Sequence, residues 1–186
     1  MAAARNRKAG TVRALTHLDD RGRARMVDVG AKATTERVAI ATATLRMLPA
    51  TQRRIRSGRI AKGEVLAVAR IAGIMAAKRT PDLVPLCHPI ALSGVEVEAT
   101  PGPGGVEIVA TVRTVDRTGV EMEALAAVSA GCLTVYDMLK RYERGMRIEA
   151  LELIEKRGGR SGHWRRAAAP ARAPAARARS RRTRAG

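Results

Sequence analysis

The order of helix and strand patterns constrains the fold of this chain more than any other feature. Apolar residues in 63–77 recur at three- and four-residue steps, which is typical of a helix with one buried face, and Thr80-Pro81 is expected to end it. A longer helix pattern covers residues 118–142. Strand patterns cover residues 36–47, 94–100, 106–115 and 147–156. The order strand, helix, strand, strand, helix, strand predicts an α+β fold, a ferredoxin-like βαββαβ sandwich with an antiparallel sheet and helices packed on one face.

The connecting segments carry weaker signals. Residues 50–57 are expected to form a short helical piece, and residues 82–89 an irregular segment. The PGPGG string at 101–105 predicts a hairpin whose turn is longer than the tightest two-residue turns. Small residues at 126–132 would let another helix or the sheet approach the long helix closely.

The positive charge lies mostly at the two ends of the chain. Of the formal net charge of +18, residues 165–186 contribute eight arginines and residues 1–14 contribute four basic groups, with no acid in either segment. Residues 15–164 keep +6 and are expected to form a single catalytic domain, flanked by disordered basic tails at 1–14 and 165–186. A moderately basic domain suits an anionic ligand, although a solvated basic surface explains the charge equally well.

The cysteines give no sign of a disulfide or a metal site. Cys87 and Cys132 are the only two, and neither has metal-type spacing. A zinc site is disfavoured because the other histidines, His17 and His163, lie near the ends of the domain. With no signal peptide and no apolar run of about 18 residues, we expect a cytoplasmic protein that needs neither a membrane nor a cofactor.

Cations around the first helix are candidate ligands of an anion. Lys62 lies in an expected turn between two glycines, Lys78 and Arg79 lie at the helix end, and Arg70 is a possible addition. Such residues are also ordinary solvated helix charges. The GGRSG string at 158–162 offers free backbone N–H groups, but it lacks the full phosphate-loop pattern.

Two carboxylates at the start of the long helix are candidate ligand acceptors. Thr118-Gly119-Val120-Glu121 fits a capping box, so Glu121 is expected to serve chiefly as a helix cap. Glu123 has no such local role and could accept a hydrogen bond from a guanine edge.

Asp137 and Lys140 are three residues apart on the long helix, so they lie on one face and can pair. Such pairs are usually solvated ion pairs, but these two follow a nearly all-apolar run, where partial burial would shift their pKa values. Cys87 and His88 do not predict a nucleophile and base, because neighbours in an extended segment point to opposite sides. His88 alone could bind phosphate or move a proton, or be an ordinary loop histidine.

Long strings in this order resemble one family. They are MVDV at 26–29, KGEVLAVARIAGIMAAKRT at 62–80, PLCHP at 85–89, TGVEMEAL at 118–125, TVYDMLK at 134–140 and GGRSG at 158–162. Together they resemble the cyclic pyranopterin monophosphate synthases, the accessory protein C family of molybdenum cofactor biosynthesis. The resemblance covers residues 15–162. Departures fall at Glu64, Ala126, Leu139 and Arg160, none of which is a proposed catalytic group.

The resemblance implies a lyase that converts 3′,8-cyclo-7,8-dihydroguanosine triphosphate to cyclic pyranopterin monophosphate and diphosphate by general acid–base catalysis. Its motifs assign acid–base roles to Lys62, Asp137 and Lys140, and substrate binding to Leu86, Cys87, His88, Met122 and Glu123. From the residues alone we add Glu121, Lys78 and Arg79 to the binding set. The family also implies a homohexamer, a trimer of dimers, with sites at subunit interfaces.

Two other classes of function compete with this interpretation. An RNA-binding module can have the same sandwich and arginine-rich tails, but such modules stack bases on sheet aromatics. This chain has no Phe, and its two Tyr and one Trp lie outside the expected strands, so nucleic acid is expected to bind only non-specifically through the tails. A purely structural assembly protein would leave the placement of Lys62, Asp137 and Lys140 unexplained.

Overall fold

The structure is a computed structural model that describes residues 18–167, except residues 20, 59 and 61–63. The described strands are β1 (Thr35–Arg46), β2 (Leu92–Gly102), β3 (Gly105–Asp116), β4 (Arg147–Arg157) and β5 (Trp164–Arg165). The described helices are α1 (Pro49–Arg56), α2 (Val65–Lys78), α3 (Thr80–Leu83) and α4 (Glu121–Leu139). Lys62 and nearly all of both expected tails lie outside the described residues.

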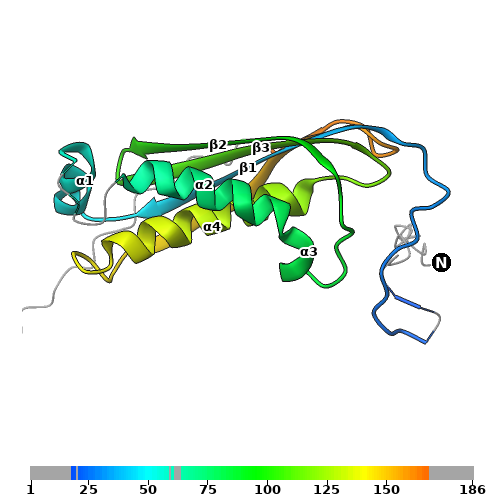
Figure 1. The fold of residues 1–186 in the computed structure, drawn as a ribbon, viewed down its shortest axis with the longest axis horizontal. Helices are drawn as coiled ribbons and strands as arrows, with labels where there is room; N and C mark the ends of the chain where they lie inside the picture. Colours follow the sequence, from blue (N-terminus) through cyan, green and yellow to red (C-terminus); the bar gives the residue numbers. More distant parts are fainter. Residues whose placement is uncertain (1–17, 20, 59, 61–63, 168–186) are drawn as a thin grey trace, which may run out of the picture.

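The strands form a single antiparallel sheet in the order β2-β3-β1-β4-β5, with α2 and α4 side by side on one face (Figure 1). The first four strands in this order have the arrangement of the ferredoxin-like fold, so the predicted fold class is confirmed. β5 adds a short edge strand that the sequence pattern does not predict. It pairs Arg165, which the sequence assigns to the C-terminal tail, with Glu155 of β4.

The core lies between the sheet and the two long helices. Alternate residues of β1 are completely buried there, namely Ala39, Ala41, Ala43 and Leu45. The helices approach closely where Gly73 of α2 faces the backbone of α4: a Cβ built on Gly73 would stand 3.0 Å from the carbonyl oxygen of Ala127. A Cβ on Gly131 would stand 3.0 Å from Ile108 of β3. The expected close approach at the small residues of the long helix is therefore confirmed.

The hairpin between β2 and β3 is tighter than predicted. Gly102 pairs with Gly105, so only Pro103 and Gly104 form the turn. Gly104 has a φ of +85°, and proline followed by a glycine with positive φ is typical of a type II turn. The prediction of a longer turn was wrong because Pro101 and Gly102 belong to β2.

Other element ends also differ from the sequence pattern. Pro81 occupies the first turn of α3, which includes residues expected to be irregular, because proline is compatible with the first turn of a helix. α4 begins at Glu121 and ends at Leu139, so it is shorter than the pattern over 118–142.

α4 has the length and mean hydropathy of a membrane span over an 18-residue window, which the expectation from the sequence missed. It is the one helix in the described part of the chain with this property. Half of that window is buried, and the helix packs against α2 and the sheet. Core helices of globular proteins share this composition, so α4 is explained as a core helix.

Candidate active site

A cavity of about 350 Å³ lies where the α3–β2 connection meets the start of α4. It brings together five residues predicted from the sequence to bind substrate: Leu86, Cys87, His88, Glu121 and Met122. The other lining residues are Val27, Val29, Lys32, Ile90, Thr118 and Gly119. We call this the α4-start cavity.

Short hydrogen bonds position the connection that carries Cys87 and His88. The buried hydroxyl of Thr80 donates to carbonyl oxygens in the last turns of α2 at 3.1 Å, which fixes the direction in which α3 leaves. The backbone N–H of Cys87 then donates to the carbonyl of Val84 at 2.9 Å. At the far end, Thr114 Oγ1 of β3 donates to the carbonyl of Ala91 at 2.7 Å. The segment is therefore held at both ends.

Cys87 and Glu123 form a pair beside the cavity. The Cys87 thiol donates to Glu123 Oε1 at 3.5 Å. Glu123 is 2% exposed, and its Oε2 has no hydrogen-bond partner within the described ranges. Burial raises the pKa of Glu123. Burial, together with the charge of Glu123, raises the pKa of Cys87 to about 11. Cys87 is therefore a protonated hydrogen-bond donor near neutral pH and not a thiolate nucleophile.

His88 has a different partner. Its Nε2 lies 2.8 Å from the carbonyl oxygen of Val27, and because a carbonyl only accepts, Nε2 carries the proton. This leaves Nδ1 as the second ring nitrogen, which can accept a proton or a hydrogen bond. Cys87 and His88 thus contact separate groups, as expected for neighbours in an extended segment.

Glu121 is not a capping residue, so the capping-box prediction was wrong. The N-cap of α4 is Val120, with no side-chain cap hydrogen bond. Glu121 Oε1 instead accepts from Lys156 Nζ of β4 at 3.1 Å. Sequence reasoning missed Lys156, because nothing local links it to a residue 35 positions earlier.

Lys78 and Arg79 lie at the end of α2, near the same end of the molecule as the α4-start cavity, but they do not line it. Both are exposed. The structure of this chain therefore supports no direct contact between these two cations and a ligand in the cavity.

Asp137 and Lys140 lie at the other end of α4. Lys140 Nζ is 2.6 Å from Asp137 Oδ1, and the side chains are 55% and 57% exposed for Lys140 and Asp137 respectively. The hydrogen bond and charge of Asp137 raise the pKa of Lys140. The expectation of a partly buried pair was wrong for this chain alone, because the last turn of α4 faces solvent, and the pKa of Lys140 moves away from neutrality.

The two groups of candidate residues are far apart in one chain. At 1.5 Å per residue, Met122 and Asp137 are separated by about 22 Å along α4. Catalytic groups act within about 3 Å of the proton they move. A ring bound beside Met122 therefore lies out of reach of Asp137 and Lys140 of the same chain.

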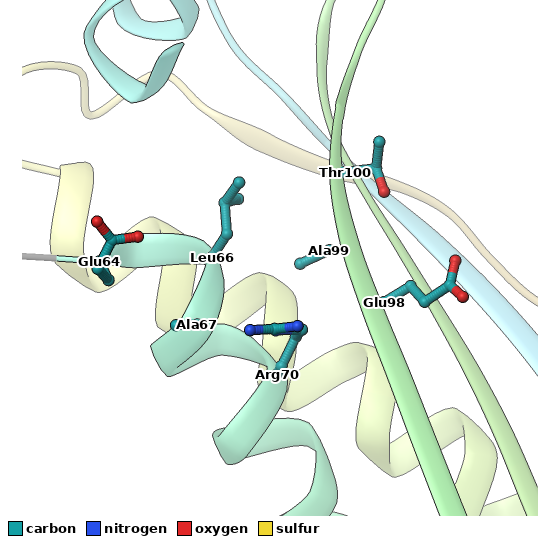
Figure 2. A pocket seen from close by; sticks show the side chains of 7 residues that line it. All are labelled: Glu64, Leu66, Ala67, Arg70, Glu98, Ala99 and Thr100. Atoms are coloured by element: carbon teal, nitrogen blue, oxygen red, sulfur yellow. The ribbon is translucent and has the colours of Figure 1, made fainter. Parts of the chain in front are cut away.

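A second cavity of about 350 Å³ lies between the start of α2 and β2. Its lining includes Arg70, the possible addition to the cations, and the acids Glu64 and Glu98. Figure 2 shows Arg70 reaching from α2 into the space beside β2, with Glu64 further toward the helix start. Glu64 precedes α2, whose first turns lie at the end of the molecule where α4 ends, because the two helices are antiparallel (Figure 1).

Arginines gather at this end of the molecule. Arg53, Arg54 and Arg56 lie in the last turn of α1, and Arg54 stacks over the Tyr142 ring at 4.6 Å. The Glu143 carboxylate accepts from Thr51 Oγ1 at 2.6 Å, so α1 is held against the turn after α4. That turn adds further exposed basic residues, Arg141 and Arg144. These arginines add positive charge to the end of the molecule that carries Asp137, which suits an anionic substrate.

Fold and cavity define a ferredoxin-like α+β protein with a cavity at the start of its core helix. Residues 26–159 match the sequence profile of the MoaC family, so the chain belongs to that family. A relative in Thermomicrobium roseum is 60% identical over 82% of this chain and 93% of its own length. Relatives in Novosphingobium aromaticivorans and Chloroflexus aggregans are 60% and 58% identical, covering 82% and 85% of this chain and 98% and 97% of their own lengths. All three are named cyclic pyranopterin monophosphate synthase.

Proposed function

We propose that this chain is a cyclic pyranopterin monophosphate synthase, a lyase that converts 3′,8-cyclo-7,8-dihydroguanosine triphosphate to cyclic pyranopterin monophosphate and diphosphate in molybdenum cofactor biosynthesis. The observation that carries the proposal is the 60% identity to synthases along nearly their whole length. The cavity at the predicted binding segments supports it independently. The proposed location is the cytoplasm.

The α4-start cavity is the proposed binding site for the guanine-derived ring. Cys87 offers a protonated thiol, and His88 offers Nδ1 as an acceptor. Glu121 and Glu123 supply the carboxyl groups that suit the N–H donors of a guanine edge. Met122 and Leu86 supply apolar contact for the flat ring.

Asp137, Lys140 and Lys62 are the proposed acid–base groups. Opening the imidazole ring and closing a pterin ring moves protons without a change of redox state. Lys140 is the proposed proton donor and Asp137 the proposed acceptor, because their side chains meet at 2.6 Å. The arginines near α1 offer positive charge to the triphosphate. Lys78 and Arg79, which do not line the cavity, add only to the overall positive charge.

The site is proposed to combine two chains, because one chain separates the ring-binding residues from the acid–base pair by about 22 Å. The outward faces of the helices also carry exposed apolar side chains that suit a second copy of this chain. They are Val68, Ile71 and Met75 of α2, and Leu133 of α4, each at least 42% exposed. The proposed assembly is a homohexamer built as a trimer of dimers, as the resemblance implies.

An RNA-binding function has less support. Trp164 does lie on a strand, contrary to the expectation from the sequence, but β5 is a two-residue edge strand. No aromatic side chain occupies β1 or β3, the strands on which base stacking is built in RNA-binding sandwiches. Any nucleic-acid binding is proposed to be non-specific and to involve the arginine-rich tails.

The test is incubation of the purified protein with the cyclic dihydroguanosine triphosphate. We expect diphosphate release in step with formation of a pterin, detected by fluorescence after oxidation. GTP, which lacks the 3′,8 bond, is the matched control and should release no diphosphate. Folded protein that yields neither product from the cyclic substrate would refute the proposal.

A further inference from the structure

Lys156 connects the α4-start cavity to the glycine-rich segment 157–162. Its Nζ donates to Glu121 Oε1 at 3.1 Å and to Ser161 Oγ at 2.6 Å. The Lys156 and Glu121 side chains are only 24% and 29% exposed. Glu121 lines the cavity, and Ser161 lies in the glycine-rich segment, so one ammonium group joins the two.

The glycine-rich segment is fitted closely onto the start of β1. Gly158 and Gly159 have φ values of +93° and +69°, which favour glycine. A Cβ on Gly158 would lie 2.0 Å from the carbonyl oxygen of Glu36, and a Cβ on Gly159 would lie 1.7 Å from Arg37 Nη1. At Gly158 the backbone of β1 leaves no room for a side chain, so the segment packs directly against β1 there; at Gly159 the neighbour is the end of the Arg37 side chain.

A buried carboxylate contacts the residues at the two ends of the same segment. Glu155 is 7% exposed, and its Oε1 accepts from Arg157 Nε at 2.5 Å and from His163 Nε2 at 3.0 Å. Arg157 and His163 flank the glycine-rich residues. The Glu155 contacts hold the residues at the two ends of the segment, and Lys156 holds Ser161 to the wall of the cavity.

The charge of Lys156 also matters to the cavity. The negative charge of Glu121 contributes to the raised pKa values of Cys87 and Glu123, so its field reaches both residues. Without Lys156, Glu121 would stand at the cavity wall without its ion-pair partner. An anionic substrate would then meet a more negative site.

We propose that Lys156 is a positioning residue for substrate binding in the α4-start cavity: it neutralises Glu121 and holds Ser161, and with it the glycine-rich segment, beside the cavity. This inference rests on the proposed function. It assigns no chemical step to Lys156, which contacts protein groups only among the residues that the structure describes.

The charge effect is tested by steady-state kinetics. Lys156→Met should raise KM by about tenfold, equivalent to about 1.4 kcal/mol, with a smaller change in kcat. Lys156→Arg keeps the positive charge, so its KM should lie between those of the unmodified protein and Lys156→Met. Adding Glu121→Gln to Lys156→Met removes the negative charge but keeps an amide oxygen that can accept from the ring, so KM should fall relative to Lys156→Met alone. A double variant that is worse than Lys156→Met, or an unchanged KM in Lys156→Met, would overturn the charge role.

The matched control is Arg166→Met. It removes the 3.1 Å ion pair from Arg166, after β5, to Glu152 of β4, and the 2.9 Å hydrogen bond to the Leu153 carbonyl, both away from the cavity. Its KM should stay within about twofold of the unmodified value, because surface ion pairs contribute little. An increase in KM equal to that of Lys156→Met would mean that the loss of any ion pair to β4 has this effect, and would refute a specific role of Lys156.

The positioning of the segment is tested without turnover. Amide hydrogen exchange of residues 158–162 should be faster in Lys156→Met and in Ser161→Ala, and unchanged in Arg166→Met. Equal exchange rates in the unmodified protein and the three variants would refute the proposal that Lys156 holds the glycine-rich segment in place. If the unmodified protein makes no pterin, the proposed function fails, but the exchange experiment still decides whether Lys156 holds the segment.

Discussion

The Cys87 thiol and the Glu123 carboxylate meet at 3.5 Å although they come from segments 36 residues apart. Neither group faces a cation within the described part of the chain, and burial raises the pKa of both. Cys87 in the wall of the α4-start cavity and Glu123 beside it are therefore acids that resist losing their protons. This gives the site a pH dependence that can be measured in the absence of substrate.

Glu123→Gln should make the protein more stable relative to the unmodified chain as the pH rises. The folded-state pKa of Glu123 lies above its unfolded value, so its favourable contribution is fully present below the unfolded pKa and is lost as the pH rises through the folded pKa. Gln does not titrate. The free energy of unfolding of each protein is measured by urea unfolding. The difference between the two should be constant in acid, and at higher pH the value of the variant should rise relative to that of the unmodified chain. A difference that does not change with pH would contradict the raised pKa.

Cys87 should react slowly with iodoacetamide at neutral pH. A pKa of about 11 leaves about a hundredfold less thiolate than an ordinary cysteine has. The rate, followed by mass spectrometry of the Cys87 peptide, should keep rising above pH 9. Glu123→Gln should speed the reaction more than Glu121→Gln, because Glu123 is the larger electrostatic cause. Fast alkylation at pH 7 would refute the protonated thiol.

Asp137→Asn should lower turnover by about 10²–10⁴, the usual contribution of general acid–base catalysis, and should hardly change the melting temperature. The pair is more than half exposed, so its loss costs little stability. Lys140→Met should have the same effect, and the double variant should be scarcely worse than either single one, because the groups act as a unit. Additive losses, or near-normal turnover in Asp137→Asn, would leave the pair as a surface ion pair.

Gly104→Ala should destabilise the protein by about 1–2 kcal/mol, because Gly104 has a φ of +85°. Gly102→Ala is the control: its Cβ would meet no atom within 4 Å, and its φ is not positive. The control should change the free energy of unfolding by less than about 0.5 kcal/mol. Equal effects of both changes in urea unfolding would contradict the two-residue turn.

The sequence predicts the fold better than its details. Apolar residues alternate along β1 and recur every three or four residues along α2. Both patterns can be recognised in the sequence because each element is buried on one side only. The length of the hairpin turn cannot be predicted from the sequence, because the glycines of PGPGG are compatible both with the turn and with the ends of the two strands. The two residues of β5 are too few to leave a periodic pattern.

The candidate site is predicted less completely. The grouping of Cys87 and His88 with Met122 rests on resemblance, and the structure places all three at one cavity. The partner of Glu121 was missed, because the capping box is a local pattern and Lys156 is a distant residue. The exposure of Asp137 could not be read from the apolar residues before it, since a helix end can leave the core within one turn.

The central claim is that one site takes its ring-binding residues and its acid–base pair from different chains, and mixing two inactive variants tests it most directly. His88→Ala and Asp137→Ala proteins are unfolded together, refolded, and shown by native mass spectrometry to form mixed oligomers. Turnover of the cyclic dihydroguanosine triphosphate should then rise well above that of either parent, because some sites combine an intact His88 from one chain with an intact Asp137 from the other. Confirmed mixed oligomers with no more activity than the parents would contradict the claim.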